Sequence, residues 1–127
     1  MYKSNYPVGD FLIRIKNAVL AGRKEVVVQE TKLIYEVAKV LNKLGYLSKV
    51  TKNKGMLKVV IVYHKRESLI TDIKLVSKPG LRIYMKVKEL ESHKKPTTMI
   101  VSTPKGVMSS RDAIKKRFGG EVIAEIL

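Results

Sequence analysis

Two segments in the first half of the chain carry apolar residues at the spacing of an α-helix, and this pattern constrains the fold more than any other feature. Residues three and four positions apart lie on one side of a helix, so each set forms one apolar face. Thr31 suits the N-cap of the second helix, and Gly22 and Gly45 end the two segments. The apolar positions are Val8, Phe11, Leu12, Ile15 and Val19, and then Leu33, Val37, Val40, Leu41 and Leu44.

Short runs that favour β-strands lie between and after these helices. Residues 26–28 are three consecutive valines, and residues 46–50 and 56–63 are two further strand candidates. The basic loop 51–55 between the last two contains Asn53 and Gly55, which predicts a hairpin. The order helix, strand, helix, strand, strand indicates a compact α/β unit.

The second half follows a different pattern, in which strands predominate. After the polar run 64–68 we expect strands over 69–76, 82–85, 98–102 and 121–127, and one irregular turn over 89–92. Lys78-Pro79-Gly80-Leu81 is typical of a type II turn, and Ser109 with Asp112 resembles the capping of a short helix that runs to residue 118. Gly119-Gly120 is expected to end that helix. The fold class expected is therefore α/β (α+β), with two small packed domains, 1–64 and 65–127, the second mostly β.

The charge is strongly positive, +15 at pH 7, and both halves of the chain carry it. A domain that folds against such self-repulsion tolerates it when its usual partner is a polyanion. Nucleic acid is the commonest polyanion, because lysine and arginine release counterions from phosphate. The alternative is a lysine-rich surface that binds only water. We favour nucleic acid on charge and size together.

Few residues are suited to catalysis or to holding a metal. The chain has no cysteine, and its two histidines, His64 and His93, lie in lysine-rich stretches without metal-ligand spacing, so we expect both at the surface. No nucleotide-binding loop is present, so neither an enzyme, a metal nor a cofactor is expected. A hydrolase using Ser102 or Ser109 is only a nominal rival, since no base is placed by the sequence. Without a long apolar run or a signal peptide, we expect a cytoplasmic protein and no membrane partner.

Two segments carry groups that could bind nucleic acid. Residues 102–111 combine hydroxyls with Lys105 and Arg111 around an expected strand-to-helix turn, where helical N–H groups would also be exposed. An ordinary capped turn, with Ser109 bonded only to its own helix, explains the spacing equally well. The second segment, 78–84, is either just a turn or presents Arg82 and Tyr84 to RNA, with the tyrosine stacked on an unpaired base.

These segments resemble a known family. Ile100-Val101-Ser102-Thr103-Pro104-Lys105-Gly106-Val107-Met108, followed by 111–113 and 119–123, is similar to the C-terminal signature of the bacterial type of the eighth small-subunit ribosomal protein. Residues 76–84 and 7–17 resemble two further blocks, in family order. The chain departs from the family where Pro104 replaces a usual serine, where Tyr6 and Ile13 replace aspartate and threonine, and where 94–98 replaces a glycine-rich approach.

The resemblance implies a binding protein without a cofactor, located on the cytoplasmic ribosome. It would bind the central domain of small-subunit rRNA, act early in assembly, and contact the fifth and twelfth proteins of that subunit. Glu121 would orient the main RNA site locally, and Arg14, Lys16, Asn17 and Lys32 would form a second surface. The other expected RNA-binding residues are Ser102, Thr103, Lys105, Gly106, Val107 and Ser109, with Lys78, Arg82 and Tyr84 beside them. A non-ribosomal nucleic-acid binder, such as a DNA-compacting protein, is the alternative.

Overall fold

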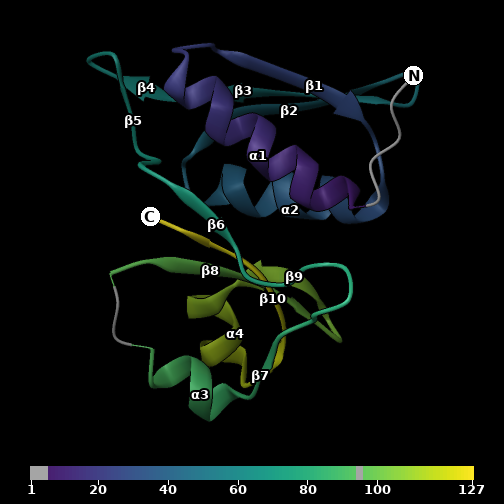
Figure 1. Ribbon diagram of the computed structural model, residues 1–127, viewed down its shortest axis with the longest axis vertical. Coiled ribbons are helices and arrows are strands. Elements are labelled where there is room, and N and C mark those ends of the chain that lie inside the picture. The colour runs from purple at the N-terminus through teal and green to yellow at the C-terminus, as the bar shows by residue number, and fades with distance from the viewer. Residues whose placement is uncertain (1–5, 94–95) are drawn as a thin grey trace. The chain divides into compact units, whose positions relative to one another are not determined.

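The computed structural model describes residues 6–93 and 96–127, and the chain divides into two compact units (Figure 1). The first extends to Thr71 and the second is Asp72–Leu127, so the division falls after the polar run 64–68 rather than within it. The run belongs to the first unit because β4 (Tyr63–His64) and β5 (Glu67–Ser68) pair with each other. The Tyr63 hydroxyl also donates a hydrogen bond to the Arg23 carbonyl oxygen at 2.6 Å.

The first unit has the expected order of elements. Its sheet is antiparallel with strand order β1-β3-β2, and α1 and α2 lie on one side of it in Figure 1. Thr31 is confirmed as the N-cap of α2, where its hydroxyl accepts the Ile34 N–H at 3.1 Å. Buried and exposed residues alternate along β1, so only one face of the sheet is covered. The elements are α1 (Pro7–Leu20), β1 (Glu25–Gln29), α2 (Lys32–Lys43), β2 (Leu47–Asn53) and β3 (Met56–Ile61).

The hairpin between β2 and β3 is tighter than predicted. Instead of a loop over 51–55, β2 continues to Asn53 and only Lys54 and Gly55 form the turn. Both turn residues have positive φ, 49° and 79°, as two-residue hairpin turns with the right twist require. Lys52 is therefore a strand residue, and its Nζ lies 3.7 Å from the centroid of the Tyr35 ring on α2.

The second unit is built around a central C-terminal strand. Strand β10 pairs with β8 on one side and with β6 and β7 on the other, and β9 pairs with the far edge of β8. Helices α3 and α4 contribute Leu90 and Ala113 to a core with Val101, Met108 and Val122. The elements are β6 (Ile73–Leu75), β7 (Tyr84–Met85), α3 (Val87–Glu91), β8 (Thr98–Thr103), β9 (Gly106–Ser109), α4 (Ser110–Lys116) and β10 (Gly120–Ile126).

Several boundaries in this unit differ from those predicted. The strands expected over 69–76 and 82–85 shorten to β6 and β7, and the turn expected over 89–92 is part of helix α3. The helix capped by Ser109 is present, but the loop after residue 103 does not lead directly into it, because strand β9 lies between the loop and the helix. The type II turn is consistent with the structure, since Lys78 and Leu81 exchange two hydrogen bonds of 2.9 Å and Gly80 has a φ of +85°.

Gly119 and Gly120, at the start of β10, do not end the preceding helix. Helix α4 ends at Lys116, and its C-cap Arg117 adopts the left-handed conformation with a φ of 64°. Gly120 instead lets two strands approach closely, because a Cβ there would lie 2.1 Å from the Ser102 carbonyl oxygen. Gly119 has the same role toward Met85, whose carbonyl oxygen would lie 2.6 Å from an added Cβ.

Candidate nucleic-acid interface

Four of the predicted site residues form one row across the sheet of the second unit. The pairing registers align Tyr84 with Glu121, Glu121 with Ser102, and Ser102 with Val107. Residues directly opposite each other on antiparallel strands place their side chains on the same face. The row thus brings together residues from four strands, and we call it the interface row.

The interface row lies on the face opposite the helices. The next residues along three of these strands pair with one another and belong to the buried core beneath α3 and α4: Val122, Val101 and Met108. Side chains alternate between the two faces of a strand, so the interface row points the other way. Tyr84 is 67% exposed, so most of its side chain is accessible to a ligand.

The tip of the β8–β9 hairpin lies at the end of the interface row. Pro104 and Lys105 form the turn and are exposed, and Gly106 has a φ of +115° that favours glycine. Thr103 is buried. Its hydroxyl donates to the Gly106 carbonyl oxygen at 2.7 Å and accepts the Lys105 N–H at 3.1 Å, so both bonds lie within the hairpin. Thr103 therefore shapes the tip, while Ser102 is half-buried and lies in the interface row.

Ser109, predicted as an RNA contact, is corrected by the structure. It is 4% exposed, and its hydroxyl accepts the Asp112 N–H at 3.2 Å as the N-cap of α4. The capped-turn interpretation is the right one for this serine. The N-terminus of α4 and the hairpin tip lie at opposite ends of β9, so they do not form one site.

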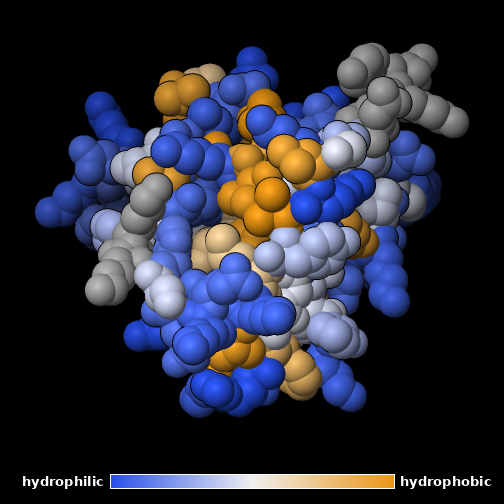
Figure 2. Space-filling view, turned by 60° about the horizontal axis from the view of Figure 1, so that its bottom comes forward, coloured by the Kyte–Doolittle hydropathy of each residue, from blue (hydrophilic) through white to orange (hydrophobic). Residues whose placement is uncertain are grey.

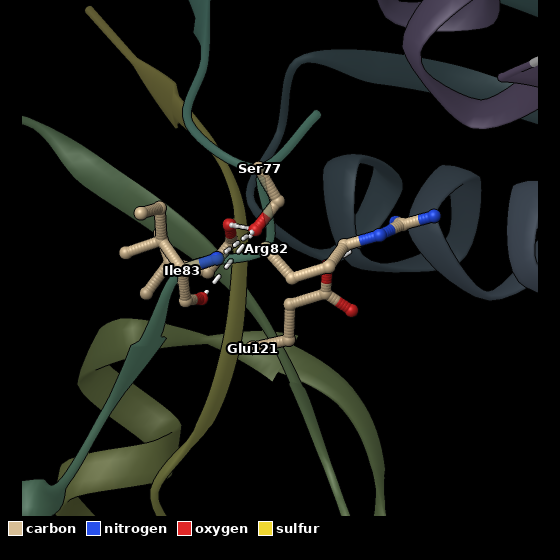
Figure 3. A network of polar contacts seen from close by, with 5 residues as sticks. Ser77, Arg82, Ile83 and Glu121 are labelled. Carbon is tan, nitrogen blue, oxygen red and sulfur yellow. Dashed lines mark hydrogen bonds and ion pairs between the residues drawn. The ribbon is translucent and has the colours of Figure 1, made fainter. Parts of the chain in front are cut away.

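The 78–84 segment lies beside the other end of the interface row. Arg82 and Glu121 form an ion pair with an Nη1–Oε2 distance of 3.3 Å (Figure 3). Lys78 is exposed at the start of the turn. The expected proximity of Arg82, Tyr84 and Glu121 is thus present, since Glu121 forms an ion pair with Arg82 and lies opposite Tyr84 in the sheet.

Ser77 also holds this segment, although the sequence analysis assigned it no role. It is fully buried, and its hydroxyl donates to the Val122 carbonyl oxygen at 2.7 Å and accepts the Ile83 N–H at 2.9 Å (Figure 3). The available sequence signal was a hydroxyl residue between an apolar run and a Pro-Gly turn. That signal does not reveal which backbone groups the hydroxyl binds.

The second surface predicted on the first unit does not form one cluster along α1. Arg14 and Asn17 are exposed and line a hollow between α1 and β1 together with Arg23. Arg14 also binds Asp10, at 3.1 Å. Lys16 is two residues from Arg14 and so faces another direction, and Lys32 lies at the first position of α2.

The remaining polar groups do not suggest chemistry on a substrate. His64 is exposed as expected, but His93 is half-buried, with its Nε2 3.0 Å from the Thr97 hydroxyl and 3.3 Å from the Glu125 carboxylate. Within residues 6–93 and 96–127, no group of three His, Cys, Asp or Glu residues could hold a metal ion. In the same part of the chain, no helix is long and apolar enough to cross a membrane.

The surface is consistent with a polyanion partner. Figure 2 shows hydrophilic side chains over much of the visible face, with hydrophobic residues between them. Along the interface row and its two flanking turns, cations, a hydroxyl, a carboxylate and an exposed ring occur together. These groups bind nucleic acid through phosphate, sugar and base contacts. The fold and the site together define a basic binding protein of the α/β class.

Comparison with known proteins identifies the family. Residues 6–127 match the model of the family described as ribosomal protein S8. A small ribosomal subunit protein uS8 from Ruegeria pomeroyi is 40% identical over 128 residues, covering 96% of this chain and 98% of the relative. Those of Nitratidesulfovibrio vulgaris (strain DP4) and Coxiella burnetii (strain RSA 331) are 37% and 38% identical, each covering 94% of this chain and 96% of the relative. The chain belongs to the ribosomal protein S8 family, and it is a ribosomal protein rather than an enzyme.

Proposed function

We propose that the protein is a constituent of the small ribosomal subunit and binds the central domain of its rRNA directly. The relatives that cover nearly the whole chain are named as proteins of that subunit. The observation that carries the proposal is the interface row, which aligns an aromatic ring, a carboxylate and a hydroxyl on the sheet face that α3 and α4 leave uncovered. Family resemblance supports the choice of the central domain.

Each group along the interface row has a distinct task in RNA binding. Tyr84 stacks on an unpaired base, since its ring is mostly exposed. The Ser102 hydroxyl binds sugar or base edges. Glu121 accepts hydrogen bonds from base N–H groups, which are donors that the bases have and the phosphates lack. Lys105, with Lys78 and Arg82, neutralises phosphates on either side. Because Pro104 has no hydroxyl, Ser102 provides the hydroxyl contact at this tip.

The mechanism is binding and not turnover. A protein that fixes an irregular RNA stem by shape and exposed edges stabilises one arrangement of the central domain. This stabilisation early in assembly would then guide the later steps, with the fifth and twelfth subunit proteins as neighbours. The exposed cations Arg14 and Arg23, with the amide of Asn17 beside them around the α1–β1 hollow, are the strongest candidates for a second contact on the first unit.

Competition binding tests the proposal. The wild-type protein is titrated with a central-domain rRNA fragment in the presence of double-stranded DNA of equal length, over a series of salt concentrations. We expect at least about tenfold preference for the RNA and, with about five phosphate contacts, a log–log salt slope of about −4.5. Equal affinity for the DNA would contradict the proposal and favour a general nucleic-acid binder.

Two lysine variants localise the contact. Lys105→Ala removes the exposed cation at the hairpin tip and should reduce the magnitude of the salt slope by about 0.9, the value of one phosphate contact. Lys115→Ala is the matched control, because Lys115 is equally exposed but lies on α4, which packs on the other face of the sheet. Equal losses for the two variants would place the RNA elsewhere.

A further inference from the structure

One edge of β10 is paired by two short strands with a gap between them. β7 pairs with Gly120 and Glu121, and β6 pairs with the stretch from Ala124 to Ile126. Val122 and Ile123 lie in the gap, where no strand is present. Buried backbone groups there need partners, because an unpaired N–H or carbonyl in the interior is costly.

The side chain of Ser77 supplies one of these partners. Its hydroxyl donates to the Val122 carbonyl oxygen at 2.7 Å, while the Val122 N–H donates to the Ile83 carbonyl oxygen at 2.9 Å. The same hydroxyl oxygen accepts the Ile83 N–H at 2.9 Å. One serine hydroxyl thus takes the place of a ladder hydrogen bond and joins the two ends of the 78–82 turn to β10 (Figure 3).

This arrangement attaches the turn to β10 at both ends, through the Ser77 hydroxyl and through the bond from the Val122 N–H to the Ile83 carbonyl oxygen, and the Arg82–Glu121 ion pair adds a further contact. Lys78 and Leu81 close the turn internally with two hydrogen bonds of 2.9 Å. Its orientation therefore depends on how its ends, Ser77 and Ile83, are fixed to Val122. Ile83 lies between Arg82 and Tyr84 in sequence, so a change at this attachment moves both side chains relative to Glu121.

We propose that Ser77 is a positioning residue for RNA recognition, acting through Arg82 and Tyr84 without touching RNA. The inference rests on the proposed function and deepens it, because it makes the buried hydroxyl responsible for the placement of the exposed groups. Ser77 is 0% exposed, so it has no contact of its own with a ligand. Its effect on affinity must pass through the segment that it holds.

Substituting a second buried serine, Ser110, is the control that distinguishes a role in stability alone from a role in positioning. Ser110 is also buried, and its hydroxyl accepts the Met99 N–H at 3.2 Å, but it lies on α4 away from the 78–84 segment. We expect Ser77→Ala to weaken binding of the central-domain fragment about tenfold and Ser110→Ala to change it less than about twofold, both measured well below the unfolding transition. Equal affinities for the two variants would overturn the inference.

A double-mutant cycle tests the route of the effect. In a background of Arg82→Ala with Tyr84→Ala, the loss caused by Ser77→Ala should shrink below about twofold. In the Lys105→Ala background it should remain about tenfold, because the hairpin tip does not depend on Ser77. A loss of the same size in both backgrounds would show that Ser77 acts by loosening the whole unit, and would refute positioning.

Two further outcomes keep the inference separate from the proposed function. If the wild-type protein shows no preference for the RNA, the proposed function fails before Ser77 is tested. If Ser77→Ala does not fold, Ser77→Cys replaces it, since a thiol occupies similar space but donates weakly. We expect Ser77→Cys to bind about threefold more weakly than wild type, and unchanged affinity would again count against positioning.

Discussion

Replacing Gly120 with alanine should strongly destabilise the second unit, because the added methyl group collides with the backbone of β8. The new Cβ would lie 2.1 Å from the Ser102 carbonyl oxygen, 2.8 Å from the Ser102 carbonyl carbon and 3.1 Å from the Thr103 Cα. Real Cβ atoms essentially never come within 3.0 Å of another group, so the backbones must separate by about 0.9 Å at the first contact. All three obstacles are backbone atoms, which cannot rotate away.

The magnitude follows from what that separation breaks. Glu121 pairs with Ser102 immediately beside the clash, and losing its ladder hydrogen bonds costs about 1 kcal/mol each. Overpacking against the neighbouring backbone at this partly buried position adds about 1–3 kcal/mol. We therefore expect Gly120→Ala to lower the free energy of unfolding by about 3–4 kcal/mol, a large part of the ~5–15 kcal/mol typical of a domain.

Urea denaturation followed by circular dichroism measures this loss, with Gly22→Ala as the control. Gly22 has a φ of +69° and nothing within 4 Å of an added Cβ, so its substitution meets backbone strain alone and should cost about 1 kcal/mol. The RNA affinity of any folded Gly120→Ala protein should also fall, because the clash displaces Ser102. A loss of stability within about 0.5 kcal/mol of that of the control would refute the close-approach argument.

Three further predictions concern single polar groups. Ser109→Ala removes the N-cap of α4 and should cost about 1 kcal/mol in urea denaturation without changing RNA affinity; a weaker complex would mean that this buried serine does contact RNA. Glu121→Gln should change the free energy of unfolding by less than about 1 kcal/mol, because the Arg82–Glu121 pair is partly exposed, and a loss above about 2 kcal/mol would contradict this. Burial raises the pKa of the Tyr63 phenol above its usual 10.0, so the unfolded chain releases this proton first. Stability should therefore be fully present below pH 10 and decrease as the pH rises beyond it; Tyr63→Phe should remove that contribution, and an unchanged pH dependence in the variant would be the opposing result.

The helices and the strands of the first unit could be predicted from the sequence because their signals are local. The apolar stripes, the Thr31 cap and the valine run at 26–28 each act within a few residues, and the observed elements match them closely. The tight turn at Lys54 and Gly55 was missed because a lysine with a φ of 49° gives no composition signal.

The second unit was harder to predict because its strands depend on distant partners. β9 has only Val107 and Met108 as apolar residues, and it becomes a strand by pairing with β8. β6 and β7 are shorter than their apolar runs because Ser77 and Ile83 bind β10 in the gap between them. Only the three-dimensional register reveals that gap.

The sequence predicted which residues belong to the candidate site better than it predicted how they are arranged. Ser102, Glu121 and Tyr84 were each named from the sequence, but their alignment in one row depends on a register shift in β10 between Val122 and Ala124. Thr103 and Ser109 illustrate the opposite case. Their hydroxyls suit RNA by residue type, yet both are used within the fold.

Mapping the RNA contact on the isotope-labelled protein by NMR tests the central claim most directly. The central-domain rRNA fragment is added, and the amide shifts of both units are followed. The account predicts the largest changes along the interface row and its flanking turns, at Tyr84, Ser102, Lys105 and Glu121. Changes confined to the helices α3 and α4, or to the first unit, would contradict it.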